Sequence, residues 1–285
     1  MNNKNFFYKL ENIVEKNKSF ICVGLDSDLE KITEKFKAKK YPQYSFNKYI
    51  INKTFDLVCS YKLNTSFYEA IGHQGIYELK LTCDYLREKY PEIPIIIDAK
   101  RADIGNTNRG YVDFVFKYLQ ADAVTVNPYL GSEALKPFLE MKDKGIIILC
   151  KTSNEGSGEI QNLKLKVKSQ KLKIPPKTAG KQKFKKLNLY QYLAYQVVNK
   201  WNKNKNCLLV IGATYPRQLK EIRSIVGDDI WFLVPGIGSQ GGDINQVLKK
   251  GLNKNGKGLI INISRSVIFA EDPREKLKDF TQNIS

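Results

Sequence analysis

The feature that most limits the fold is a repeated alternation of short apolar runs with longer helical patterns along the chain. Eight such runs, rich in β-branched residues, lie at positions 20–25, 57–63, 93–100, 121–127, 145–152, 207–214, 231–237 and 258–264. Runs such as PIIID and GIIILC are apolar on both faces, which is typical of parallel strands that are covered on both sides. Eight strand–helix units favour an eightfold β/α barrel over a doubly wound sheet.

The length of the chain agrees with one barrel. The chain has 285 residues, and a TIM (β/α)8 barrel usually needs about 250. We therefore predict an α/β fold with a single (β/α)8 barrel domain over residues 1–285. The N-terminal stretch lacks the apolar core of a signal peptide, and no apolar run approaches the roughly 20 residues of a membrane span. These observations predict a cytoplasmic protein with no membrane partner.

A basic segment interrupts the alternation after the fifth predicted strand. Residues 155–188 are rich in lysine, and residues 161–188 hold ten lysines and no acidic residue, over half of the formal net charge of +18. We predict a mobile Lys-rich insertion here, either a solvated loop or a lid or docking element. Nucleic-acid binding through this insertion is an alternative function. Because the segment has few aromatic residues for base stacking, we expect no specific nucleic acid.

Cysteine and histidine usage narrows the possible chemistry. The five cysteines have no CxxC spacing, and most lie in or beside apolar runs, so we predict buried free thiols rather than disulfides or metal ligands. Because His73 is the only histidine, a multi-histidine metal site is excluded. The chemistry therefore rests on lysine, aspartate and arginine.

Polar residues recur where the predicted strands end. Barrel enzymes build their active sites at the C-terminal ends of their strands. The residues at or just beyond these ends are Asp26, Lys62, Asp98, Lys100, Asn127, Ser153 and Arg265.

The segment IIIDAKRADIGNT, residues 95–107, carries the sharpest signal. Residues two apart in a strand face the same side, about 6.6 Å along the chain, so Asp98 and Lys100 are both expected to point into the barrel mouth. Opposite charges in that place are costly unless they are paired or used. Taken singly, the two residues are also compatible with a structural ion pair.

The pattern DxKxxD in this segment resembles the signature of the orotidine 5'-monophosphate decarboxylase family. Further motifs resemble that family and stand in the family's order. They are GLDSD (24–28), YKLN (61–64), NPYLGSEAL (127–135), KTSN (151–154), PGIGSQGGD (235–243) and ISRSV (263–267). The resemblance covers nearly all of the chain outside the basic insertion.

The resemblance implies a carboxy-lyase that converts orotidine 5'-monophosphate to UMP, at the last step of de novo pyrimidine biosynthesis, without metal or organic cofactor. It implies a catalytic network of alternating charge formed by Lys62, Asp98, Lys100 and Asp103. Lys100 is the implied proton donor. Asp103 and Thr107 are implied to complete the site of a second subunit, so we expect a homodimer with shared active sites.

The resemblance also assigns substrate-binding residues. Asp26, Lys62 and Asn64 are expected at the ribose hydroxyls, and Ser153 at the pyrimidine edge. The phosphate is expected at Gln240, Arg265 and the loop that begins at Pro235, in agreement with the usual barrel phosphate site after strands 7 and 8.

Two further hypotheses stay open at this point. A Mg²⁺-dependent phosphosugar decarboxylase or epimerase of the same superfamily is the alternative enzyme. Against it stands Lys62, where that group is expected to carry an acidic metal ligand. We also expect a possible association with orotate phosphoribosyltransferase through the basic insertion.

Overall fold

A computed structural model describes residues 5–168, 184–238 and 241–282. Eight parallel strands close into one barrel in the order β1-β10-β9-β8-β5-β4-β3-β2, and β6 and β7 form a separate two-stranded sheet. The predicted barrel is therefore confirmed. The barrel strands are β1 (Ile21–Gly24), β2 (Ser60–Asn64), β3 (Ile95–Arg101), β4 (Ala123–Val126), β5 (Gly145–Lys151), β8 (Cys207–Ile211), β9 (Phe232–Pro235) and β10 (Leu259–Ile263).

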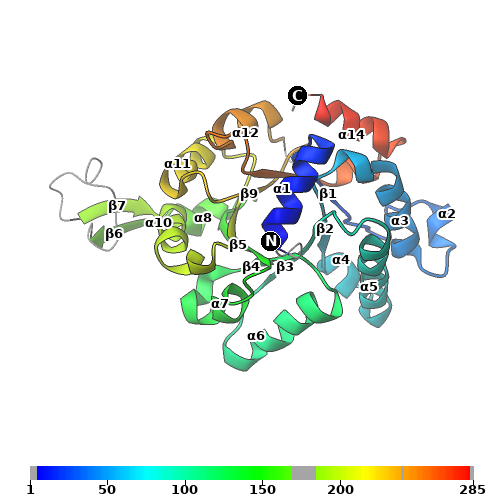
Figure 1. Ribbon diagram of the computed structural model, residues 1–285, viewed down its shortest axis with the longest axis horizontal. Helices are drawn as coiled ribbons and strands as arrows, with labels where there is room; N and C mark the ends of the chain where they lie inside the picture. Colours follow the sequence, from blue (N-terminus) through cyan, green and yellow to red (C-terminus); the bar gives the residue numbers. More distant parts are fainter. Residues whose placement is uncertain (1–4, 169–183, 239–240, 283–285) are drawn as a thin grey trace.

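Helices surround this barrel and follow its strands in the order of the chain (Figure 1). The longer ones are α1 (Phe6–Asn17), α3 (Pro42–Thr54), α5 (Gly72–Lys89), α6 (Gly105–Val112), α7 (Gly131–Leu139), α10 (Leu189–Gln196), α11 (Pro216–Val226), α12 (Ile244–Gly251) and α14 (Pro273–Thr281). Short turns of helix are α2 (Glu34–Lys37), α4 (Ser66–Glu69), α8 (Ser157–Gln161) and α13 (Arg265–Ile268). Single 3-10 or π turns are η1 (Phe55–Leu57), η2 (Asp113–Tyr118), η3 (Pro128–Leu130), η5 (Val197–Trp201) and η6 (Asn202–Asn204).

Local sequence explains where several helices begin. Helices α3, α11 and α14 each have proline in the first helical turn, where its missing N–H is not needed. The carboxylates of Asp243 and Asp272 accept hydrogen bonds from the first backbone N–H groups of α12 and α14. Each predicted strand is present within three residues of its predicted ends.

Two strand boundaries shift by three residues: β2 begins at Ser60 rather than at residue 57, and β8 ends at Ile211 rather than at residue 214. Before β2 the chain forms the 3-10 turn η1 instead. The side-chain amide of Asn17 donates hydrogen bonds to the carbonyls of Phe55 and Val58, at 3.0 and 2.8 Å. These bonds hold the backbone out of the sheet, and the periodicity of the sequence does not contain them.

Helix α1 lies across the barrel in Figure 1 and covers the end where the strands begin. Phe6 and Leu10 are fully buried, and a Cβ atom on Gly145 at the start of β5 would lie 2.6 Å from the Phe6 ring. The barrel is therefore closed at this end, and the opposite end, where the strands finish, carries the polar residues predicted as the site.

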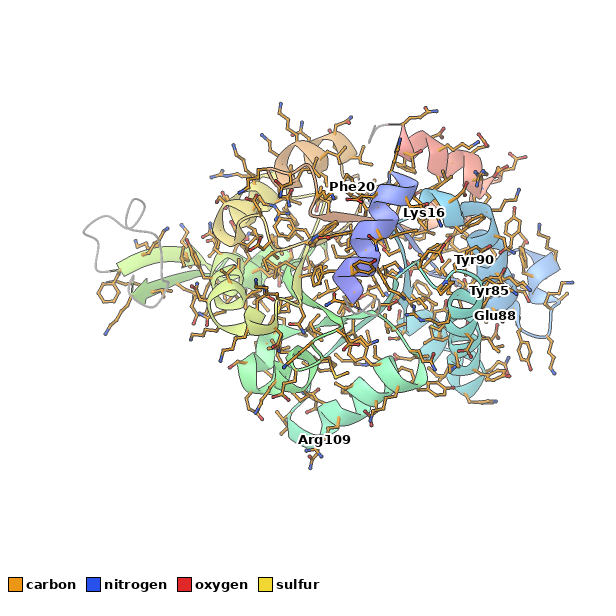
Figure 2. All side chains as sticks on the ribbon, viewed as in Figure 1. Lys16, Phe20, Tyr85, Glu88, Tyr90 and Arg109 are labelled. Atoms are coloured by element: carbon orange, nitrogen blue, oxygen red, sulfur yellow. The ribbon has the colours of Figure 1, made fainter. Side chains whose placement is uncertain are left out.

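The outer faces of the helices carry the charged and polar side chains. Figure 2 shows Arg109 of α6 pointing away from the barrel. All five cysteines are buried and free, as predicted. Among the described residues, no helix is long and apolar enough to cross a membrane.

The segment after β5, which was predicted as a mobile Lys-rich insertion, contains regular elements in the parts that the structure describes. Residues 157–161 form α8, and β6 (Lys164–Lys168) pairs with β7 (Phe184–Asn188) in an antiparallel ribbon. The ribbon projects away from the barrel (Figure 1). In β6 the lysines alternate with Leu165 and Val167, and this period of two allows one face to be covered while the other presents charge. Residues 169–183 lie outside the described residues.

Candidate active site at the C-terminal ends of the strands

A cavity of about 480 Å³ opens where the barrel strands finish. The residues that line it are Asp26, Lys62, Asn64, Asp98, Lys100, Thr125, Leu149, Thr152, Ser153, Asn154, Gln161, Val210, Leu233, Pro235, Gly236, Ile237, Asn262, Ser264 and Arg265. Eight of the eleven predicted site residues therefore line one cavity; Asp103 and Thr107 are not among the lining residues, and Gln240 lies outside the described residues. The parallel register explains this convergence, because Gly24 pairs with Lys62 and Asn64 pairs with Asp98.

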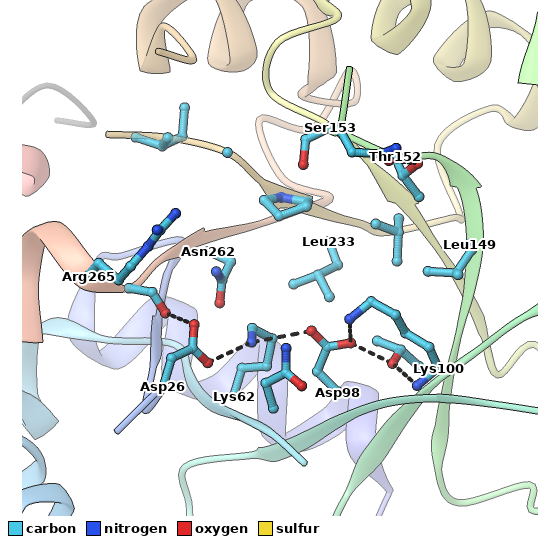
Figure 3. Close-up of a pocket in the computed structure, with 18 of the residues that line it drawn as sticks. Asp26, Lys62, Asp98, Lys100, Leu149, Thr152, Ser153, Leu233, Asn262 and Arg265 are labelled. Atoms are coloured by element: carbon cyan, nitrogen blue, oxygen red, sulfur yellow. Dashed lines mark hydrogen bonds and ion pairs between the residues drawn. The ribbon is translucent and has the colours of Figure 1, made fainter. Parts of the chain in front are cut away.

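Four charged side chains form a row of alternating sign along one wall of the cavity (Figure 3). The Nζ atom of Lys62 lies 3.4 Å from Asp26 Oδ1 and 3.4 Å from Asp98 Oδ2. The Nζ atom of Lys100 lies 2.8 Å from Asp98 Oδ1. The exposed fractions of the Lys62 and Asp98 side chains are 5% and 13%, whereas that of Lys100 is 48%. Lys100 is therefore the charged group of the row that reaches furthest into the open cavity.

A bulge in β3 gives Lys100 this position. The β3–β4 register shifts between Ile97 and Arg101, and Lys100 has a φ of 49°, a backbone conformation that costs a non-glycine residue energy. The Thr125 hydroxyl accepts a hydrogen bond from Lys100 N at 2.9 Å and donates one to Asp98 Oδ1 at 2.7 Å. Both charged side chains line the cavity as predicted, but through a bulge that Thr125 supports rather than through regular alternation.

The charges in the row stabilise one another. Burial by itself raises the pKa of Asp98, but the ammonium groups of Lys62 and Lys100 and the hydrogen bonds from Lys100 and Thr125 outweigh burial and lower this pKa to about 2. Burial likewise disfavours the charged form of Lys62, yet the carboxylates of Asp26 and Asp98 raise its pKa above the usual value. Both groups are therefore charged at neutral pH.

Asp26 is held from the side of β10. The Ser264 hydroxyl donates a hydrogen bond to Asp26 Oδ2 at 2.5 Å. A Cβ atom on Gly24 would lie 1.9 Å from this hydroxyl, so only glycine leaves room for the contact. Ser264 was not predicted as a site residue, although it belongs to the quoted motif ISRSV. Asn64 lines the cavity beside this group, and its side-chain oxygen accepts hydrogen bonds from Ser66.

The loop after β5 forms the wall across the cavity from the charged row, as Thr152 and Ser153 show in Figure 3. Ser153 lines the cavity as predicted. A Cβ atom on Gly212 would lie 2.6 Å from Ser153 Cα, so glycine after β8 permits this close approach. Leu149, Val210 and Leu233 supply an apolar floor between the two polar walls. A flat ring with polar edges fits such a space.

The loop after β9 and the start of α13 form the third side of the cavity. Pro235 and Arg265 line it as predicted. Gly236 and Gly238 have φ values of 104° and 79°, which side chains with a Cβ atom adopt only with strain. Gln240, which was predicted at this place, lies outside the described residues.

Asp103 and Thr107 do not line this cavity. The backbone N–H of Asp103 donates to Asn108 Oδ1 at 2.8 Å, and Asn108 is itself buried and bonded to the carbonyl of Ala134. Thr107 is exposed at the start of α6. Within one chain, these two residues therefore stand apart from the charged row.

The fully buried Lys151 at the end of β5 was not predicted as a notable residue. Its Nζ donates a hydrogen bond to the Ser157 hydroxyl at 2.7 Å and lies 4.1 Å from the centre of the Tyr215 ring. Burial lowers the pKa of Lys151. Within the described residues, no group of three or more His, Cys, Asp or Glu side chains is placed to hold a metal ion.

Comparison with known proteins identifies relatives across nearly the whole chain. The model of the family described as "Orotidine 5'-phosphate decarboxylase / HUMPS family" matches residues 19–175 and 176–280. An orotidine 5'-phosphate decarboxylase of Cellvibrio japonicus is 43% identical over 269 residues, covering 94% of this chain and 90% of that protein.

Solved structures give the same result. The structure of Leishmania donovani OMP decarboxylase is 34% identical with a TM-score of 0.81, covering 98% of this chain and 97% of that one. Leishmania donovani UMP synthase is 35% identical with a TM-score of 0.82, and the match covers 98% of this chain but 56% of that longer chain.

Proposed function

The chain belongs to the orotidine 5'-phosphate decarboxylase / HUMPS family, and from this premise we propose how its charged row works. The chain is a carboxy-lyase that converts orotidine 5'-monophosphate to UMP, the last step of pyrimidine biosynthesis. We assign this activity to the cavity because the charged row of Asp26, Lys62, Asp98 and Lys100 lies there, at the strand ends.

The reaction requires electrostatic help. When the bond between C6 and the carboxylate breaks, its electron pair stays on C6 in an sp2 orbital that the ring does not delocalise. In our proposal the substrate carboxylate lies against Asp98, and the repulsion between the two anions is relieved as CO2 departs. The Lys100 ammonium stabilises the negative charge on C6 and then transfers a proton to it.

Lys62 favours the ionised form of Asp98. Its ammonium lies between two carboxylates at 3.4 Å from each, and the low pKa of Asp98 is supported by this contact. Lys62 between Asp26 and Asp98 also disfavours the Mg²⁺-dependent alternative, because a cation already lies where a metal ion would need both carboxylates.

We propose that the remainder of the substrate is bound by the other walls. Asp26, Lys62 and Asn64 hold the ribose hydroxyls, and Ser153 binds the pyrimidine edge. The phosphate is bound by Arg265, Gln240 and the loop that begins at Pro235, and this remote binding energy helps to place the substrate carboxylate against Asp98.

We propose a homodimer in which Asp103 and Thr107 complete the partner's site. Exposed apolar residues after β3 and β4, which are neighbouring strands of the barrel, support this. Ile104 follows Asp103 and has an exposed fraction of 62%, and Tyr129 and Leu130 after β4 are 85% and 50% exposed. Exposed apolar side chains that gather on one side of a protein are typical of an interface. A fully active monomer in analytical ultracentrifugation would refute this proposal.

The basic ribbon is the proposed docking element for orotate phosphoribosyltransferase. The exposed lysines of β6 and β7 present positive charge away from the barrel, and the solved chain titled UMP synthase extends beyond the part matched here. Replacing residues 164–188 by a short turn is expected to abolish co-purification of the two proteins. Unchanged co-purification would rule this association out. The single domain over residues 1–285 and the cytoplasmic location stay predictions.

The test of the decarboxylase mechanism is the ultraviolet absorbance change when metal-stripped protein meets orotidine 5'-monophosphate. We expect rapid loss of the substrate band with the unmodified protein and with the surface control Lys117→Ala, but not with Lys100→Ala. If the unmodified protein left the absorbance of orotidine 5'-monophosphate unchanged and converted only a sugar phosphate in the presence of Mg²⁺, the proposal would be refuted. An active Lys100→Ala variant would refute the assigned proton donor.

A further inference from the structure

The loop after β1 is held by a buried polar network behind the cavity wall. Tyr68 of α4 lies at the centre of this network and is fully buried. Its hydroxyl donates a hydrogen bond to the carbonyl of Leu25 at 3.0 Å and accepts hydrogen bonds from the side chains of Ser27 and Asn47 at 3.3 and 2.8 Å. Because Leu25 and Ser27 flank Asp26, this one hydroxyl contacts the chain on both sides of a charged residue of the cavity.

The partners fix the direction of these hydrogen bonds. The Thr82 hydroxyl donates to the carbonyl of Glu78 at 2.8 Å, so the group of Asn47 that lies 3.1 Å from Thr82 must be its NH2 group. That NH2 group also donates to Tyr68, so the hydrogen of the Tyr68 hydroxyl is directed to the Leu25 carbonyl. Burial raises the pKa of Tyr68, and the hydroxyl therefore keeps this hydrogen at neutral pH.

Gln43 of α3 holds the same loop at a second point. Its side chain is fully buried, and its NH2 group donates to the carbonyls of Ser27 and Phe67 at 2.7 and 2.9 Å. Phe67 precedes Tyr68 in α4. One side chain therefore joins the loop after β1 to the short helix that follows β2.

These contacts determine where Asp26 lies relative to Lys62. Leu25 N donates to the carbonyl of Lys62 at 2.8 Å, and the Asp26 carboxylate lies 3.4 Å from the Lys62 ammonium (Figure 3). The Ser264 hydroxyl binds the other carboxylate oxygen of Asp26. Ser264 thus holds the end of the side chain, whereas Tyr68 holds the backbone on either side of it. The carboxylate keeps one position only if both are fixed.

We propose that Tyr68 and Gln43 are positioning residues for recognition of the ribose, and that they act through Asp26. The inference rests on the proposed function, in which Asp26 binds a ribose hydroxyl. It goes beyond that function because it assigns a role to buried residues of α3 and α4 that do not line the cavity. A ribose hydroxyl gains binding energy from a carboxylate that is held in one position, whereas a deoxy sugar lacks the donor for it.

The test measures the affinities of UMP, 2'-deoxy-UMP and 3'-deoxy-UMP by isothermal titration calorimetry. We define the ribose preference as the affinity of UMP divided by that of the deoxy nucleotide that binds more weakly. This ratio does not depend on the fraction of protein that is folded, so a purely structural defect leaves it unchanged. Tyr68→Phe removes only the hydroxyl. The control Tyr190→Phe removes another buried hydroxyl, which donates to Glu221 at 2.6 Å, away from the cavity lining.

We expect Tyr68→Phe to lower the ribose preference about fivefold, the effect of one weakened hydrogen bond. Tyr190→Phe is expected to leave the preference unchanged. If Tyr68→Phe does not fold, Gln43→Met removes the second contact at similar volume and is expected to lower the preference in the same way. A preference that neither Tyr68→Phe nor Gln43→Met changes overturns the inference.

A double-mutant cycle then tests whether Tyr68 acts through Asp26. In an Asp26→Asn background the remaining preference comes from Lys62 and Asn64, and Tyr68→Phe is expected to lower it no further. An equal fall in both backgrounds overturns the inference, because the hydroxyl would then act by another route. An unmodified protein that does not bind UMP, or that binds all three nucleotides equally tightly, overturns the proposed function and the inference with it.

Discussion

Replacing Asp98 by asparagine removes the negative charge between two lysine ammonium groups while keeping the shape of the side chain. The structure predicts a cost in stability as well as in activity. Lys62, which is 5% exposed, then retains the carboxylate of Asp26, and Lys100 loses the carboxylate oxygen 2.8 Å away. Removing one partner of a buried ion pair leaves an incompletely compensated charge in a poorly solvated place.

The size of the effect follows from the pKa of Asp98. This pKa is about 2 in the folded protein instead of the ordinary 3.8. At about 1.4 kcal/mol for each pKa unit, the difference corresponds to about 2 kcal/mol of stability. Because the folded-state pKa is the lower one, this stabilisation is fully present above about pH 4 and is lost as the pH falls through about 2.

Urea unfolding at fixed protein concentration measures this directly, with the fluorescence of the buried Trp201 and Trp231 as the signal. Asp98→Asn is expected to lower the free energy of unfolding by about 2 kcal/mol at pH 7, and by progressively less between pH 4 and pH 2. The control Asp113→Asn removes a carboxylate from an exposed ion pair with Lys117 and should change little. Equal stabilities at pH 7, or a difference independent of pH, would refute the reasoning.

Three further predictions concern other parts of the molecule. Arg265→Ala is expected to raise KM by roughly 100-fold, and Arg265→Lys by less, in steady-state assays; an unchanged KM would contradict phosphate binding at this residue. Tyr129→Glu places a charge in the proposed interface and should give an inactive monomer in sedimentation velocity, so an active dimer would count against that interface. Arg274 binds both carboxylate oxygens of Asp56 at 2.7 and 2.6 Å; Arg274→Ala should cost about 0.5–1 kcal/mol in urea unfolding, and no measurable loss would show that this pair is only a surface contact.

The sequence by itself determined the barrel and much of its site. Eight apolar runs with helical patterns between them predict eight parallel strands, because each strand must be apolar on both covered faces. Polar residues just beyond those runs then meet at one end of the barrel, since parallel strands finish on the same side. This reasoning placed Asp26, Lys62, Asp98, Lys100 and Ser153 together without any coordinates.

The regular elements in the described parts of the insertion were not predicted from the sequence. The lysine-rich composition predicted a mobile loop, but composition averages over a segment and conceals its period. Lysines that alternate with Leu165 and Val167 have the period of two that a ribbon needs. The structure also shows that α8, inside the predicted loop, reaches the cavity through Gln161.

Only the tertiary structure decided which neighbours hold the residues that line the cavity. Thr125 of β4 holds Asp98, and Ser264 after β10 holds Asp26; both are distant in sequence from the residue that they hold. Gln161 of α8 holds Thr152, which lies nine positions away. A periodic pattern in the sequence indicates which face of a helix or strand is covered. It does not indicate which hydroxyl or amide of another element forms a hydrogen bond with a residue on that face. The bulge that turns Lys100 toward Asp98 is likewise set by hydrogen bonds between strands, and these form only when the barrel closes.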